Sequence, residues 1–223
     1  RTALHDLYGL TETGSCDFHA QPAGEGADAA DAGTIGRPTA GVTFRITGPD
    51  GGAVPAGEAG ELRIRTPYGM LGYLDDPALT ASALDDGHFR TGDLARAGPD
   101  GRVILVGRLT DIVSRGGNKI APQEIDDLLA THPDIAAALC AGVPDARLGE
   151  ALHAVVVPRP GAVLTAGAVR AWAAARIERF KLPDVITIAQ ALPVGPTGKA
   201  SRALLREHAL AGAQARAAAG IDG

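Results

Sequence analysis

The chain has 223 residues, of which 45% are hydrophobic and 21% charged, as in an ordinary globular protein of one large or two small domains. Its formal net charge of −5 excludes a global basic field that would attract nucleic acid or an anionic membrane. No apolar run approaches the roughly 20 residues of a membrane-spanning helix. Cys16 and Cys140 form no CxxC pair, so we expect a reducing, cytoplasmic compartment.

The sequence pattern of the first half of the chain predicts a small β unit. A small, polar stretch at 21–34 predicts a loop, and period-two alternation predicts short strands at 42–46 and 61–65. A further apolar run predicts a strand at 103–106. The intervening GPDG sequences are turns, because Pro presets one φ and Gly accepts a positive one. We expect a mostly antiparallel β unit over about 35–107.

The second half alternates helices and strands. Pro122 begins a helix, and later helices are expected from about 165 to 179 and from 201 to about 213. Strands are expected at 151–157 and 185–188. This pattern predicts a small α+β domain over 108–223, following a first domain over 1–107. Because the chain opens on Arg1 without an obvious first element, we expect it to be a fragment of a longer protein.

Four short stretches contain chemistry-bearing residues. The first is YGLTET at 8–13, which joins an aromatic ring, a hydroxyl and a carboxylate within a few residues. An aromatic face can stack on a base, a hydroxyl can contact phosphate, and a carboxylate can bind Mg²⁺. The alternative is a turn with an exposed acid. The second is TGD at 91–93, where we expect a tight turn to hold Asp93. Its carboxylate would accept hydrogen bonds from ribose hydroxyls. The alternative is that Asp93 only caps the turn.

The other two stretches lie further along the chain. The third runs over 107–119 and joins GRLTD at 107–111 to SRGGNK at 114–119. It contains basic residues and paired glycines, which permit close approach of a ligand or form an ordinary hairpin. PTGKASR at 196–202 is not a Walker A loop, because Pro193 stands where its first glycine would be. Lys199 is a point charge that can neutralise phosphate, or the loop is simply the start of the last helix.

The order of these motifs, with GYLDDP, RTGD and APQEI between them, resembles the adenylate-forming superfamily of acyl- and aryl-CoA synthetases, luciferases and peptide-synthetase adenylation domains. The likeness runs from Leu7 to about Leu205. It implies a mixed α/β fold: the end of a large nucleotide-binding domain with its small β-barrel-like subdomain, then a mobile α+β lid. The stretch GGNKIAPQEI is most similar to acyl- or aryl-CoA ligases.

The resemblance also implies roles in the nucleotide site. Tyr8 would stack on adenine with Gly9 beside it, Thr11 would contact the α-phosphate, and Glu12 would bind Mg²⁺. The other implied nucleotide and ribose contacts are Asp93, Arg108 and Lys119.

On the lid, Lys199 would bridge the carboxylate substrate and the α-phosphate of ATP. Gly116 and Gly117 would line the passage for the thiol of coenzyme A. Thr110 occupies the hinge position, where the family usually has Asp or Lys.

The implied reaction activates a small carboxylic acid with ATP as acyl-AMP and then transfers the acyl group to CoA. The family's phosphate-binding loop is absent from these residues, so we expect the chain to be inactive alone. Two alternatives stay open: an enzyme that loads an acyl-carrier protein, or a truncated, non-catalytic nucleotide-binding protein.

Overall fold

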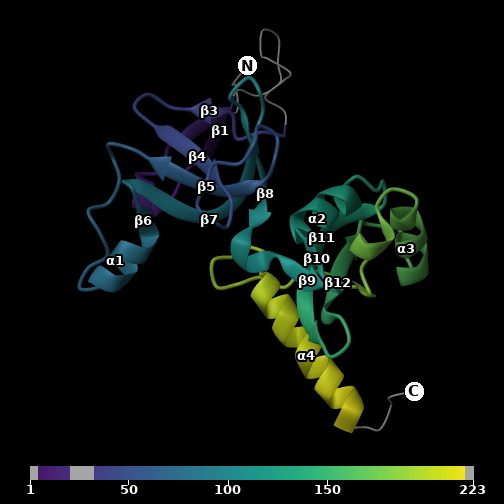
Figure 1. The fold of residues 1–223 in the computed structure, drawn as a ribbon. Helices are drawn as coiled ribbons and strands as arrows, with labels where there is room; N and C mark the ends of the chain where they lie inside the picture. Colours follow the sequence, from purple (N-terminus) through teal and green to yellow (C-terminus); the bar gives the residue numbers. More distant parts are fainter. Residues whose placement is uncertain (1–4, 21–32, 219–223) are drawn as a thin grey trace. The chain divides into compact units, whose positions relative to one another are not determined.

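The computed structural model describes residues 5–20 and 33–218, which form two compact units that divide between Leu109 and Thr110 (Figure 1). The expected mixed α/β architecture is confirmed. Most of the loop expected at 21–34 lies outside the described residues. Among those described, no helix has the length and apolar character needed to cross a membrane.

The described part of the first unit contains two antiparallel sheets. The smaller has the order β1-β2-β3, with β1 (Asp6–Tyr8), β2 (Phe18–Ala20) and β3 (Arg37–Pro38). The larger has the order β4-β5-β7-β6, with β8 also paired to β7. Its strands are β4 (Thr43–Thr47), β5 (Gly60–Arg65), β6 (Leu84–Asp85), β7 (His88–Ala97) and β8 (Val103–Arg108).

A single apolar cluster joins these strands to the segment that carries YGLTET. Phe18 is fully buried against Leu62, Ile64 and Val103, and Tyr8 and Leu10 pack on the same cluster. The ring of Tyr8 meets that of Phe18 edge to face, with centroids 6.0 Å apart. The core therefore positions the YGLTET segment through its apolar side chains.

The sequence patterns missed the short helix α1 (Pro77–Ala83) and its capping signal. Asp76 accepts a hydrogen bond from the backbone N–H of Leu79 at 2.8 Å, and Pro77 occupies the first helical position. Both are standard features of a helix N-terminus.

The prediction that a tight turn holds Asp93 was wrong, because TGD lies inside the long strand β7. The register between β5 and β7 shifts between Glu61 and Arg63, which makes a bulge. Gly92 supplies the positive φ of +70° that this bulge requires. The Thr91 hydroxyl donates to the carbonyl of Leu62 at 2.7 Å and fixes the bulge to the neighbouring strand.

The second unit is built on a five-stranded sheet of order β10-β9-β12-β11, with β13 parallel to β12. Its strands are β9 (Val113–Arg115), β10 (Asn118–Ile120), β11 (Ile135–Asp145), β12 (Gly149–Pro158) and β13 (Val185–Ile188). The apolar run of β11 had not been predicted as a strand. It pairs in antiparallel register with β12, Leu139 opposite Val155, and forms the longest ladder of the unit.

Helices cover both faces of this sheet (Figure 1). On one face, α2 (Pro122–Ala130) and α3 (Ala166–Ala174) enclose Cys140, Leu152 and Val156. On the other, α4 (Arg202–Ala218) places Leu205 against Leu139 and Ala141. Alternate residues of β11 thus face opposite helical layers, as strand geometry requires.

Two helix boundaries differ from the sequence prediction. Helix α3 ends at Ala174, five residues before the expected end at 179, and a turn then brings Ile177 onto the same core. Apolar spacing alone cannot distinguish a further helical turn from such a loop. Helix α4 extends to Ala218, beyond the expected end at about 213, because its Ala-rich sequence favours helix.

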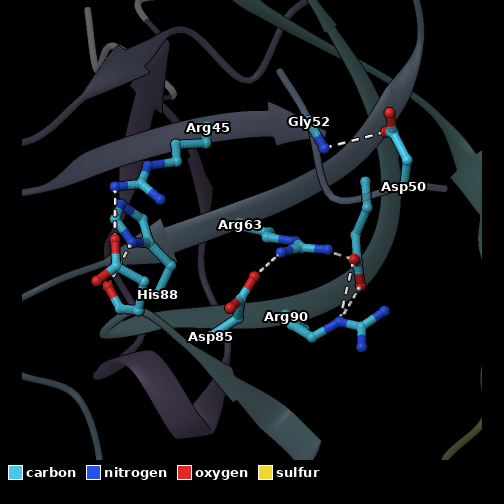
Figure 2. Close-up of polar contacts among 9 residues, drawn as sticks. Arg45, Asp50, Gly52, Arg63, Asp85, His88 and Arg90 are labelled. Atoms are coloured by element: carbon cyan, nitrogen blue, oxygen red, sulfur yellow. Dashed lines mark hydrogen bonds and ion pairs between the residues drawn. The ribbon is translucent and has the colours of Figure 1, made fainter. Parts of the chain in front are cut away.

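A buried ion network joins the strands of the first unit (Figure 2). Arg63 lies between Asp85 and Glu61, donating from Nε to Glu61 Oε2 at 3.1 Å, and its side chain is 8% exposed. Arg90 Nε also contacts Glu61 Oε2 at 3.1 Å. Without Arg63, the buried Glu61 would keep only the partly exposed Arg90 as its charged partner.

We therefore expect Arg63→Met to lower the free energy of unfolding by about 1–3 kcal/mol, because the buried Glu61 loses one of its two charged hydrogen-bond partners. Arg45→Met is the matched control. Arg45 pairs with the exposed Asp86 at 2.9 Å, and loss of such a surface pair costs about 0–1 kcal/mol. Equilibrium urea unfolding measures both. Equal effects of the two substitutions would contradict a structural role for the buried network.

Burial raises the pKa of Asp126 in α2 to about 6 from its ordinary 3.8, although the guanidinium of Arg202 opposes this shift. The folded state therefore binds the proton more tightly than the unfolded state. The resulting stabilisation is present below the unfolded pKa and is lost as pH rises through about 6. We expect the difference in unfolding free energy between wild type and Asp126→Asn to fall by about 2 kcal/mol from pH 4 to pH 7. Urea unfolding across this range would reveal it, and a pH-independent difference would refute it.

Candidate nucleotide-binding site

The YGLTET segment forms a compact loop at the end of β1. The backbone N–H of Asp17 donates to the carbonyl of Tyr8 at 2.9 Å, and Ser15 N–H donates to the carbonyl of Leu10 at 2.9 Å. A side chain at Gly9 would not fit, because its Cβ would lie 2.5 Å from the carbonyl carbon of Ser15. The loop returns so closely on itself that only glycine is accommodated there.

Two of the predicted site residues converge on the carboxylate of a third. The Tyr8 hydroxyl donates to Asp93 Oδ2 at 2.7 Å, and Arg108 Nε donates to Asp93 Oδ1 at 3.1 Å. Asp93 and Arg108 face each other in the register of β7 and β8. Along the chain, Tyr8 lies 85 positions from Asp93, and Arg108 lies 15 positions from it.

The surroundings of this cluster hold the carboxylate in place. Asp93 is 6% exposed, and its backbone N–H donates to the Thr91 hydroxyl at 3.0 Å. Burial raises the pKa of Tyr8 well above its usual range, and the adjacent Asp93 carboxylate adds to the shift. Tyr8 is therefore a permanent hydrogen-bond donor at neutral pH. The Arg108 side chain is 67% exposed and presents its remaining N–H groups to solvent.

Thr11 and Glu12 lie on a one-turn 3₁₀ segment, η1 (Thr11–Thr13), at the tip of the same loop. Glu12 Oε1 accepts a hydrogen bond from the Tyr73 hydroxyl at 3.2 Å, and among the described residues its second carboxylate oxygen has no hydrogen-bond donor. The loop is further tied by Met70, whose N–H donates to the Glu12 carbonyl at 2.8 Å. A half-exposed carboxylate oriented in this way fits a Mg²⁺ that is otherwise held by water and phosphate.

In the second unit, Gly116 and Gly117 form the two-residue turn of the β9–β10 hairpin. Their φ angles are +54° and +85°, as a type I′ turn requires, and nothing lies within 4 Å of a Cβ placed at Gly117. Lys119, on β10, donates from Nζ to the Ser114 hydroxyl at 2.6 Å across the hairpin. The hairpin thus presents an open backbone next to a basic group.

Lys199 lies on a second tight hairpin. Gly195 N–H donates to the Lys199 carbonyl at 2.9 Å, and Gly198 has a φ of +75°. Within the described residues, the exposed Lys199 side chain makes no hydrogen bond or ion pair. Thr110 is exposed in the 3₁₀ segment η3 (Leu109–Asp111), a geometry frequent at hinges.

Sequence reasoning missed two residues that support the first-unit cluster. Tyr73 contacts Glu12, and its signal was present in the GYLDDP motif, for which no role had been assigned. Thr91 connects Asp93 to β5 through its hydroxyl. Only the register of the strands reveals that contact.

Comparison with known proteins is consistent with a nucleotide site. The family of AMP-binding enzymes matches residues 1–74, and the AMP-binding enzyme C-terminal domain matches residues 124–199. These matches define the class as AMP-binding enzymes. The chain belongs to the adenylate-forming superfamily.

Individual relatives are similar over most of this chain. Probable CoA ligase CCL9 of Humulus lupulus is 37% identical over 179 residues, covering 80% of this chain and 34% of the relative. The fatty acid–[acyl-carrier-protein] ligase ScoC of Streptomyces coeruleorubidus is 34% identical over 202 residues, covering 91% and 39%. ATP-bound MatB from Rhodopseudomonas palustris has a TM-score of 0.84 at 31% identity, covering 92% and 40%. The chain spans little more than a third of the curated relatives' length.

The close approach at Gly9 yields a direct test. We expect Gly9→Ala to lower the unfolding free energy by about 1–3 kcal/mol, because the new Cβ meets backbone rather than a flexible side chain. Displacement of Tyr8 should also weaken ATP binding, measured by calorimetry. The matched control is Gly69→Ala, whose Cβ would meet atoms no closer than 3.5 Å. Equal stability and affinity of the two variants would contradict this account of the loop.

Proposed function

We propose that this chain is the C-terminal part of an AMP-forming acid–thiol ligase that converts a carboxylic acid to its CoA thioester. Residues 1–107 are the end of the nucleotide-binding domain, with its β subdomain over 35–107, and residues 108–223 are the lid. The convergence of Tyr8 and Arg108 on Asp93 carries this proposal, because it assembles the side chains expected for a nucleoside. The reaction belongs in the cytoplasm, and the two free cysteines suit a reducing compartment.

In the first half-reaction, a carboxylate oxygen of the acid attacks the α-phosphorus of ATP. The bond from that phosphorus to the bridging oxygen breaks, and pyrophosphate leaves with the electron pair. Asp93 accepts hydrogen bonds from the ribose hydroxyls, with Arg108 and Lys119 as further nucleotide contacts. Tyr8 stacks on adenine beside Gly9, and Thr11 contacts the α-phosphate. Lys199 neutralises charge on the reacting oxygens, the kind of stabilisation that contributes most to such transfers.

Glu12 is the residue that would hold Mg²⁺, which supplies charge neutralisation on the phosphates when bound. In the second half-reaction, the sulfur of CoA attacks the acyl carbon. The carbon–oxygen bond to AMP breaks, AMP leaves as an anion, and the thiol proton passes to solvent. Gly116 and Gly117 form the wall of the thiol passage, because their lack of side chains leaves the β9–β10 turn open.

The lid turns about Thr110 between the two half-reactions. Lys199 serves the first, and the Gly116–Gly117 turn serves the second. Both lie in the second unit, so one rigid movement exchanges them. The 3₁₀ segment that contains Thr110 lies where the two units divide.

A second acceptor is supported by one relative. ScoC is named as a ligase of fatty acids to acyl-carrier protein, and it covers 91% of this chain. A carrier-bound pantetheine thiol presents the same reacting group as CoA. The catalytic residues would be shared, and the difference would lie in how the rest of the acceptor docks.

The proposal is tested by AMP release from the full-length enzyme with Mg-ATP, a panel of carboxylic acids, and CoA added or withheld. Multiple turnovers only with CoA support the CoA ligase. A single equivalent of acyl-AMP that CoA does not discharge, but carrier protein does, identifies the second acceptor. No pyrophosphate release with any acid would overturn both.

We expect Lys199→Ala to slow acyl-AMP formation by about a hundredfold or more, because it removes the charge that neutralises the reacting oxygens. Thioester formation from supplied acyl-AMP should stay within about twofold of wild type, since Lys199 does not serve that step. Lys181→Ala is the control, because Lys181 is paired with Glu124 at 2.6 Å and has no proposed role. Loss of both half-reactions in Lys199→Ala would contradict the assignment.

A further inference from the structure

The guanidinium of Arg202, three residues after Lys199, contacts four other residues of the second unit. Its Nη1 contacts Asp126 Oδ2 at 2.7 Å and donates to the carbonyl of Cys140 at 2.5 Å. Its Nη2 donates to Gln123 Oε1 at 2.8 Å, and its Nε donates to Asp111 Oδ2 at 3.2 Å. The planar guanidinium is thus bound on all three nitrogens, and the side chain is only 16% exposed.

The partners of Arg202 come from parts of the unit that are far apart in sequence. Asp126 and Gln123 belong to α2, on the opposite face of the sheet from α4, and Cys140 belongs to β11. Asp111 belongs to η3, immediately after the proposed hinge residue Thr110. One side chain therefore connects both helical layers and the 3₁₀ segment.

Arg202 also anchors the turn that carries Lys199. The stem of that turn is held by a bridge between Val194 and Ala200 and by Ser201 N–H, which donates to the Pro193 carbonyl at 2.9 Å. Lys199 itself is exposed, and the turn continues directly into α4 at Arg202. The contacts of Arg202 therefore fix the orientation of the turn that carries Lys199.

Arg206, one helical turn later, offers an internal comparison. Its Nε donates to the Gly142 carbonyl at 2.7 Å, and its Nη2 contacts Glu150 at 3.4 Å. It holds the same helix to the same sheet, but in the part of the chain that the structure describes it makes no hydrogen bond or ion pair with η3, and its side chain is 42% exposed. Docking of α4 on the sheet can therefore be tested separately from its connection to η3, because of these two arginines Arg202 alone contacts η3 among the described residues.

From this arrangement we infer that Arg202 is a positioning residue for Lys199, and that its pairing with Asp111 couples the Lys199 turn to the hinge segment. The inference rests on the proposed function of Lys199 in acyl-AMP formation. When the pairing is intact, movement of η3 carries the lysine turn with it as one body. Loss of the pairing leaves Lys199 chemically intact but less often in place, which lowers kcat without weakening ATP binding.

The test uses three variants of the full-length enzyme: Arg202→Lys, Asp111→Asn, and the double variant that combines these two substitutions. Arg206→Lys is the control. Arg202→Lys keeps the positive charge, so Asp126 and Asp111 still face a cation. The lysine cannot reproduce the planar guanidinium, so it cannot make all of these contacts at once. We expect each Arg202 or Asp111 variant to lower kcat for acyl-AMP formation about tenfold, with KM for ATP unchanged. The double variant should lose no more than either single variant, because both remove one shared contact. Arg206→Lys should stay within about twofold of wild type.

Thioester formation from supplied acyl-AMP should be unaffected in all four variants, since Lys199 does not serve that step. Backbone hydrogen exchange over 195–201 should quicken in Arg202→Lys and not in Arg206→Lys. Normal acyl-AMP formation in Arg202→Lys and Asp111→Asn would overturn the inference, as would equal losses in Arg206→Lys. If wild-type enzyme activates no acid, the proposed function fails, and unchanged exchange over 195–201 would separately overturn the anchoring role.

Discussion

The buried carboxylate of Asp93 is the contact on which the first unit's site depends. It lies 6% exposed within β7, and a carboxylate in such a place must be hydrogen-bonded to be tolerated. Tyr8 and Arg108 provide those bonds from segments at opposite ends of the unit's sequence. Because the same bonds satisfy the carboxylate and bring the two segments together, assembly of the site and stability of the unit have a common cause.

The bulge that holds Asp93 shows how the sheet serves this contact. Gly92 takes a positive φ, and the Thr91 hydroxyl bonds the neighbouring strand, so β7 shifts register at this point. A regular strand would alternate its side chains strictly between the two faces. The shift alters that alternation just before Asp93, and bulges often serve in this way to redirect a side chain.

The second unit uses arginine for a related purpose. Its sheet is covered on both faces, and Arg202 connects the two helical layers at Asp126 and Cys140. The apolar core supplies most of the stability through Leu129, Leu152 and similar residues, but apolar contacts are non-directional. The guanidinium adds direction, which is what a turn that must present a single lysine requires.

Local patterns were sufficient for much of this protein. Period-two alternation located β4 and β5, and Pro122 and Ser201 marked the beginnings of α2 and α4. These features depend on a few neighbouring residues. The order of the YGLTE, RTGD and PTGK motifs also established the superfamily. Strand β11 and helix α1 were missed, because a continuous apolar run and a helix of about two turns contain little periodicity.

The sequence by itself determined the residue types of the site and their order along the chain, because these are local chemical facts. Tertiary structure decided that Asp93 lies in a bulged strand rather than a turn, that Tyr8 donates to it, and that Arg202 reaches Asp111. Each of these depends on strand register or on packing across a sheet, between residues 15 to 91 positions apart. Such contacts follow from the folding of the whole unit, and no short stretch of sequence encodes them.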